Sequence, residues 1–334
     1  MKLFVCLTAA AGVCAAAALT AQAQVYPDPA GGWLYKFDGD AAAPGSGGFT
    51  ALDGTWSHDN GSDQWDGTGI GEGRPGGVSA LVEDGTTFLR IQDTGDPRDY
   101  GMSDPGSNRK EYFGHDLTDQ GASASLLDEG VTLSFRARVA TSGLLDDAHP
   151  DGGAGVMPWP AGGDGYLTHD GGKANFGIRQ ANGGLVSFAL ALESDTGVAD
   201  GLLMNNLNGD SITGAVDAGD PGTPNLLMLD TTMWHEYWIT IKAGGAGTHQ
   251  VSVYVDGSLT PTVFDVTAGS GRESDFGDIS YVAIGLGATP QSGAIDIDFV
   301  AVAEGAIAPV PEPATWALGG LGLLGLALLR RKRA

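Results

Sequence analysis

The feature that most constrains the fold of this chain is the alternation of apolar and polar residues in short segments. From Val131 to Val139 every odd position is apolar and every even position is polar, the pattern of a β-strand with one buried face and one solvated face. Other short apolar segments are separated by clusters of Gly, Asp, Asn and Pro, which are typical of turns. Between its two ends the chain shows no convincing helix, and we therefore expect an all-β domain.

The expected strands fill most of the region between the two ends. They cover residues 33–37, 78–82, 87–92, 110–116, 131–139, 174–179, 185–192, 234–242, 250–255, 261–265, 279–286 and 294–303. About a dozen antiparallel strands without helices predict a two-sheet sandwich. Two long segments, 144–172 and 196–230, show little periodicity and are expected to be binding loops or simply mobile loops.

The N-terminal end reads as a signal peptide covering residues 1–23. Lys2 precedes an uncharged apolar run, and Ala21-Gln22-Ala23 is a small-x-small cleavage site, so cleavage is expected after Ala23. A first transmembrane helix is the alternative, but no charged flank follows the run. Both cysteines, Cys6 and Cys14, lie in this leader. The mature chain therefore has neither disulfides nor thiol chemistry.

The C-terminal end, residues 309–334, has three parts. Pro311, Glu312 and Pro313 form a stiff spacer, residues 314–329 carry no charge, and a basic group follows. That group would stop transfer on the cytoplasmic side and consists of Arg330, Arg331, Lys332 and Arg333. Because sixteen residues are slightly short for a bilayer span, we expect one short transmembrane helix that holds residues 24–308 outside the cytoplasm.

This three-part tail resembles the PEP-CTERM sorting signal. The resemblance implies recognition by an exosortase-type membrane protease, anchoring in the inner membrane, and then transfer to the cell surface or the extracellular space. Hydropathy by itself supports only a C-terminal anchor.

The charge of the exported domain excludes one class of partner. Without Lys2, Glu312 and the basic end, the chain has 12 basic and 40 acidic residues, a net charge of −28. Nucleic acids and polyanionic glycans need Lys and Arg to displace their counterions. We therefore expect no nucleic-acid partner. The acidic surface suits solvation in salty water or the binding of divalent cations.

The middle of the chain, over about residues 31–304, resembles the LamG-like, concanavalin A-like jelly rolls. The resemblance is carried by a hairpin, Trp234-His235-Glu236-Tyr237-Trp238-Ile239-Thr240-Ile241 and Val251-Ser252-Val253-Tyr254-Val255-Asp256-Gly257, and by a closing strand over 294–302. It implies a two-sheet antiparallel jelly-roll sandwich in which the opening strand lies beside the closing strand. Trp33, Trp234 and Trp238 are strand residues and are expected in the core. This fold serves lectins, glycanases, lyases and adhesion modules alike.

Signatures of catalysis are absent from the sequence. Glu-x-Asp occurs at 193–195 and again at 273–275, and both lack the third Glu of laminarinase-type hydrolases. No Gln-x-His of alginate-lyase type and no Gly-x-Ser-x-Gly elbow occurs. We identify no catalytic residue, and an enzyme is the less favoured hypothesis.

Calcium is the cofactor that the acidic residues suggest, because carboxylates are its preferred ligands. In the closing strand, Asp296 and Asp298 are expected together on the face opposite to Ile295, Ile297, Phe299 and Ala301. Jelly rolls of this type often hold a structural calcium between the first and last strands, and the resemblance brings Asp38 near Asp298. The alternative is that these aspartates simply face water.

Glycan binding requires exposed aromatic rings with polar neighbours. Trp56 and Trp65 lie in a polar, Gly-rich region, and Trp159 lies in the loop 144–172; the alternative is that these rings pack their loops onto the domain. The sequence therefore predicts an exported protein that binds carbohydrate or another surface matrix. A polysaccharide-degrading enzyme of the same fold and a purely structural surface protein are the alternatives.

Overall fold

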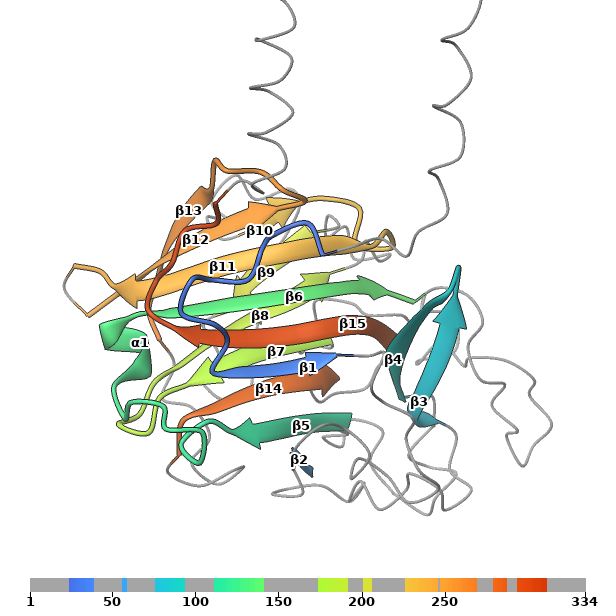
Figure 1. Cartoon of the computed structure of the whole chain (residues 1–334), viewed down its shortest axis with the longest axis horizontal. Coiled ribbons are helices and arrows are strands. Elements are labelled where there is room, and N and C mark those ends of the chain that lie inside the picture. Colours follow the sequence, from blue (N-terminus) through green and yellow to red (C-terminus); the bar gives the residue numbers. More distant parts are fainter. Residues whose placement is uncertain are drawn as a thin grey trace, which may run out of the picture.

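The exported domain is a sandwich of two antiparallel β-sheets in a computed structural model (Figure 1). The structure describes residues 24–38, 56–58, 76–93, 111–140, 174–191, 201–205, 226–245, 247–268, 279–286 and 293–310. These ranges contain the whole all-β architecture that the sequence predicts.

The first sheet, called sheet A here, has eight strands. Seven form a continuous order, and β1 (Tyr35–Asp38) pairs with β15 beside that order. The order is β13 (Thr262–Val266), β12 (His249–Val255), β11 (His235–Ala243), β6 (Val131–Val139), β15 (Gly293–Glu304), β4 (Thr86–Asp93), β3 (Gly76–Glu83).

The second sheet, called sheet B, has seven strands. Their order is β10 (Leu226–Met228), β9 (Gly201–Asn205), β8 (Leu185–Ala191), β7 (Ala174–Arg179), β14 (Tyr281–Leu286), β5 (Glu111–Asp116), β2 (Trp56–His58). Chain neighbours such as β5 and β6 lie in different sheets, so the chain crosses repeatedly between the two layers. This is the jelly-roll architecture.

The core lies between the two sheets and is built from the alternating apolar residues. Phe135 of β6 and Phe176 of β7 stack across the interior with ring centroids 3.8 Å apart, and both side chains are fully buried. A four-residue helix, α1 (Leu126–Glu129), adds Leu126 and Leu127 to the core at one end of the sandwich (Figure 1). The even residues of β6 consequently point to the outer face of sheet A.

A β-bulge interrupts the closing strand β15 at Asp298. The pairing register with β6 shifts between Ile297 and Phe299, and an extra residue in one strand reverses which face the following residues occupy. Val300 and Val302 therefore join Ile295 and Ile297 in the core. The expectation that Phe299 and Ala301 share a face with Ile295 is wrong, because it assumed an uninterrupted alternation.

The bulge also marks a change of partner along one side of β15. Residues up to Ile297 pair with β4, whereas Phe299 pairs with Asp38 of β1 and the pairing continues to Val302. The first and last strands are therefore adjacent, as the jelly-roll resemblance implied. The expected hairpin is also confirmed, since β11 and β12 pair from Tyr237 with Val255 to Ala243 with His249.

Three short strands and one helix differ from the sequence-based expectations. The segment 196–230 was expected to be a loop, but β9 and β10 lie within it and pair with each other. The strand β2 and the helix α1 were not expected either. These elements have three to five residues, and such short strands are held by their neighbours rather than by a pattern of their own. The loop 144–172 lies outside the described residues.

Candidate functional site

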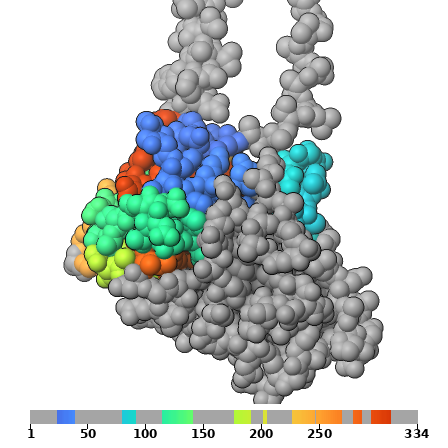
Figure 2. Space-filling model, turned by 60° about the horizontal axis from the view of Figure 1, so that its bottom comes forward, coloured from blue at the N-terminus to red at the C-terminus, as the bar shows by residue number. Residues whose placement is uncertain are grey.

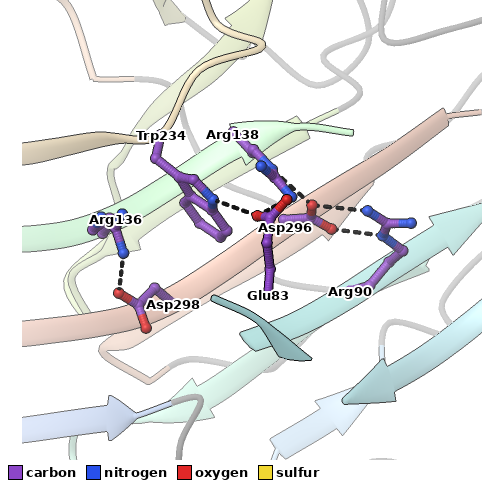
Figure 3. A network of polar contacts seen from close by, with 7 residues as sticks. All are labelled: Glu83, Arg90, Arg136, Arg138, Trp234, Asp296 and Asp298. Atoms are coloured by element: carbon purple, nitrogen blue, oxygen red, sulfur yellow. Dashed lines mark hydrogen bonds and ion pairs between the residues drawn. The ribbon is translucent and has the colours of Figure 1, made fainter. Parts of the chain in front are cut away.

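A network of charged and aromatic side chains occupies the outer face of sheet A where β3, β4, β6 and β15 meet (Figure 3). Its members come from separate parts of the chain. They are Glu83, Phe88, Arg90, Arg136, Arg138, Trp234, Asp296 and Asp298.

Asp296 is the buried centre of this network. It is fully buried and lies in register between Arg90 on β4 and Arg138 on β6. Arg90 donates to both carboxylate oxygens, at 2.6 Å to Oδ1 and 2.8 Å to Oδ2, and Arg138 donates to Oδ2 at 2.9 Å. Such paired, charge-assisted hydrogen bonds fix the side chains precisely. The Asp296 carboxylate therefore links Arg90 of the β3–β4 hairpin to Arg138 of the central strand β6.

The outer part of the network surrounds Trp234, which is only partly buried. The guanidinium carbons of Arg136 and Arg138 lie 4.8 and 4.6 Å from the centroid of its ring, within the range of cation–π attraction. Phe88 contacts the same ring edge-on, with centroids 5.3 Å apart. Two arginines and a buried phenylalanine thus hold the indole in one orientation.

Glu83 completes the network at the surface. Its Oε2 accepts a hydrogen bond from Trp234 Nε1 at 3.2 Å and forms an ion pair with Arg138 Nη2 at 2.8 Å. The hydrogen bond from Trp234 and the charge of Arg138 hold the pKa of the Glu83 carboxyl below its usual value, although partial burial opposes this. The Glu83 side chain is 46% exposed, so an ionised acceptor lies beside the indole at the edge reached by solvent.

The charges of the network balance locally. Three arginines face the carboxylates of Glu83, Asp296 and Asp298; the last accepts from Arg136 Nη1 at 2.6 Å. Within the described residues, the network on this face therefore carries no net charge, in a domain with a strong excess of acidic residues. It offers fixed donors, fixed acceptors and an aromatic ring at one place. Those groups suit the recognition of a polar, uncharged ligand.

The aspartates predicted to bind calcium are brought together, but arginines occupy two of them. Asp296 and Asp298 point to the same outer face, and Asp38 pairs in register with Phe299, next to Asp298. Within the described ranges, no three His, Cys, Asp or Glu side chains form a group that could hold a metal ion. A calcium ion would have to compete with Arg90, Arg138 and Arg136 for these oxygens. Calcium binding stays a prediction.

Of the three tryptophans predicted to bind glycans, the structure describes only Trp56. Trp65 and Trp159 lie outside the described residues. Trp56 belongs to β2, at the edge of sheet B, and stands in register opposite His115. That position lies in the other sheet from the network, and glycan binding by Trp56, Trp65 and Trp159 stays a prediction.

Three other tryptophans, Trp33, Trp234 and Trp238, were expected in the core. Trp238 is buried in a small apolar cluster with Tyr26 and Tyr254, whereas Trp33 and Trp234 are only partly buried. All three lie on the outer face of sheet A. Trp238 is buried there by Tyr26 and Trp33, with ring centroids 5.6 and 5.3 Å away, and not by the core between the sheets. Burial is confirmed for Trp238 and not for Trp33 and Trp234, which precede the strands β1 and β11 instead of lying within them.

Most residues of the network were missed by sequence reasoning. A signal was present, because Arg136 and Arg138 occupy polar positions of a central strand in a chain with few basic residues. Their partners were hidden, since Arg90 and Asp296 are 206 positions apart.

Comparison with protein families identifies one segment. A model described as the PEP-CTERM protein-sorting motif matches residues 309–333, which include Pro311, Glu312 and Pro313. The motif indicates that the chain is exported and associated with a membrane. In the part of the chain that the structure describes, no helix is long and apolar enough to span a membrane. The proposed helix 314–329 and the basic end lie outside that part.

Similar folds occur among solved structures at low identity. A carbohydrate esterase from a Shiga toxin-encoding bacteriophage is 12% identical, with a TM-score of 0.39, over 82% of this chain and 98% of that one. An endo-β-1,4-glucuronan lyase from the fungus Trichoderma reesei is 14% identical, with a TM-score of 0.38, over 81% and 95%. A glycoside hydrolase family 131 catalytic domain from Coprinopsis cinerea is 10% identical, with a TM-score of 0.37, over 79% and 89%. A comparison with curated proteins finds no match.

Proposed function

We propose that this protein is displayed at the cell surface by an exosortase-type system and binds polysaccharide there through the outer face of sheet A around Trp234. The observation that carries the proposal is the indole of Trp234, which Arg136, Arg138 and Phe88 hold in place beside the exposed carboxylate of Glu83. The sorting motif supports the location, and this cluster supports the activity.

The chemistry of the cluster fits a sugar. A pyranose ring presents C–H groups that stack on an aromatic ring and hydroxyls that both donate and accept hydrogen bonds. Trp234 supplies exposed apolar surface, Glu83 supplies acceptors and Arg138 supplies donors. Because these groups are already fixed by one another, little conformational entropy is lost when a ligand binds.

The charge of the domain narrows the ligand class. A net charge of −28 outside the two ends repels polyanions at a distance, while the network itself is balanced. We therefore propose a neutral polysaccharide as the ligand, rather than an acidic one. A surface matrix polymer with the same hydroxyl chemistry falls within this proposal.

The test is glycan binding by the purified protein and by the variants Trp234→Ala and Glu83→Gln. Loss of the indole should weaken binding at least about tenfold, as for a central contact residue, and loss of the carboxylate should weaken it less. Met233→Ala is the matched control, because Met233 is the exposed apolar neighbour of Trp234 and lies outside the network.

The outcomes separate the competing hypotheses. Neutral-glycan binding that Trp234→Ala abolishes and Met233→Ala preserves supports the proposal. Release of reducing sugar from a polysaccharide would instead support an enzyme of this fold. Binding to no glycan, or binding unaffected by Trp234→Ala, would contradict the assigned site and favour a structural surface protein.

A further inference from the structure

Two chain segments near the ends of the exported domain cross the outer face of sheet A and meet at Trp238. The N-terminal segment, residues 24–34, lies beside the last part of the domain on the surface (Figure 2). Tyr26 and Trp33 contact the Trp238 ring, and Trp238 Nε1 donates to the Ile307 carbonyl at 2.7 Å. The N-terminal segment is thus part of the folded domain.

The N-terminal segment is held by a buried carboxylate. Glu236 is 1% exposed, and its two oxygens accept hydrogen bonds from the backbone amides of Val25, at 2.5 Å, and Tyr26, at 2.9 Å. Tyr26 itself is buried, and its hydroxyl donates to the Ser258 carbonyl at 3.2 Å. These contacts begin immediately after the predicted cleavage site at Ala23.

The Glu236 carboxylate lacks a hydrogen-bonded cation within the described residues. Its hydrogen bonds there are the two from backbone amides, which carry partial charges only. Arg136 is its cross-strand neighbour, and its positive charge favours the ionised Glu236, but Arg136 forms a hydrogen-bonded ion pair with Asp298. Asp256 accepts a hydrogen bond from the Glu236 amide at 2.9 Å and adds a second negative charge nearby. A buried carboxylate in such surroundings is costly unless a positive charge is supplied.

Cleavage after Ala23 would supply that charge. The new α-amino group of Gln24 is separated from the Val25 nitrogen by three covalent bonds, which span less than about 4 Å. The side chain of Gln24 is also held, since its Oε1 accepts from Lys36 Nζ at 3.0 Å and its Nε2 donates to Asp28 Oδ1 at 3.4 Å. The ammonium group is therefore created next to Glu236 in a segment that is already positioned.

We propose that Glu236 is the docking site for the ammonium group that signal-peptide cleavage creates at Gln24. Removal of the leader then stabilises the folded domain as well as releasing it from the export machinery. The proposal rests on cleavage after Ala23 and is independent of glycan binding.

The experiment compares two forms of the full-length chain purified in mild detergent. One form begins at Gln24 after processing, and the other retains Ala21, Gln22 and Ala23, so that a neutral peptide bond replaces the ammonium group. Each is also made with Glu236→Gln. We expect the extension to lower the melting temperature of the native chain by about 2–4 °C and to have little effect in the Glu236→Gln background.

The control variant is Glu304→Gln, because Glu304 is an exposed glutamate that also accepts a backbone hydrogen bond, from Ser123 at 3.1 Å. The extension should lower the melting temperature of this variant as it does that of the native chain. Equal melting temperatures with and without the extension would overturn the proposal, as would an equal decrease in the Glu236→Gln background. If Glu236→Gln fails to fold, the proposal is tested by the mass of the secreted native protein, which identifies its first residue and the state of its amino group. A free amine at Gln24 supports the proposal, and a different first residue or a cyclised Gln24 overturns it.

Discussion

Both oxygens of the buried Asp296 carboxylate accept hydrogen bonds from Arg90, at 2.6 and 2.8 Å. The two residues face each other across adjacent strands, and Arg138 contacts the same carboxylate from the opposite side. This geometry makes the network rigid. It also makes the network vulnerable at its centre, because Arg90 and Asp296 depend on each other and both are removed from water.

The buried ion pair gives the first prediction. Asp296→Asn leaves Arg90 and Arg138 without their common counter-charge, and breaking a buried pair in this way costs about 3–5 kcal/mol. Urea denaturation should show this decrease in the free energy of unfolding. Asp265→Asn on the exposed side of β13 is the control and should change it by less than about 0.5 kcal/mol. A similarly small effect of Asp296→Asn would show that the network is dispensable for stability.

The second prediction distinguishes calcium from arginine as the partner of the closing-strand aspartates. A cation that binds only the folded state stabilises it by about 2.7 kcal/mol at 100 times its dissociation constant. If the arginine contacts persist in solution, the melting temperature should be the same in calcium and in chelator. Asp298→Asn should then lower the melting temperature by the same amount in calcium and in chelator. A melting temperature that falls on chelation, and no longer does so in Asp298→Asn, would establish the calcium site instead.

The third prediction concerns pH. The hydrogen bond with Asp256, 2.7 Å from Nδ1, raises the pKa of His235 above 6.5, and burial raises the pKa of Glu236 above 4.5. A raised pKa in the folded state means that stability is present below the unfolded value and lost as pH rises through the folded one. His235 should therefore contribute a loss of stability as the pH rises above 6.5, and Glu236 should contribute a loss at lower pH in the form that retains the residues before Gln24. The lowered pKa of Glu83 acts in the opposite direction at acidic pH.

The variant His235→Gln separates these two contributions. It should remove the loss of stability above pH 6.5 and leave the loss at lower pH in place. The measurement is the midpoint of chemical denaturation at a series of pH values. An unchanged profile in the variant would show that another group titrates in the upper range.

The fourth prediction concerns the sorting tail. Deletion of residues 314–334 should release the domain into the medium, because the apolar segment and basic end would no longer anchor it. Substitution of Pro311, Glu312 and Pro313 should leave a larger, membrane-retained form on immunoblots. Retention of the deleted form would refute the anchor, and normal processing of the substituted form would refute recognition of the motif at these residues.

Local patterns were sufficient to predict most of the strands. The bounds of β6 and β7 coincide with the ranges expected from alternation, and those of the other long strands differ by one or two residues. The failures are the short strands β2, β9 and β10 and the four-residue helix α1. In these elements pairing or packing against distant neighbours outweighs any local preference.

The bulge at Asp298 shows why the site was harder to predict than the fold. Alternation placed Asp296 and Asp298 on one face correctly. Alternation could not show that the pairing register shifts at Asp298. The shift occurs where the strand that pairs with β15 changes from β4 to β1, and this depends on the tertiary structure.

The sequence by itself determined the all-β class, the sorting motif at the C-terminal end and the acidic character of this protein, since these depend on residues close together in the chain. Only the tertiary structure decided that Trp234 and the three arginines form one site, and that Glu236 holds the N-terminal segment. Those contacts join residues that are distant in the chain: Trp234 and Glu83 are 151 positions apart, Arg138 and Asp296 are 158 apart, and Val25 and Glu236 are 211 apart. Their partners are set by strand register and sheet order, which are properties of the assembled sandwich and of no single segment.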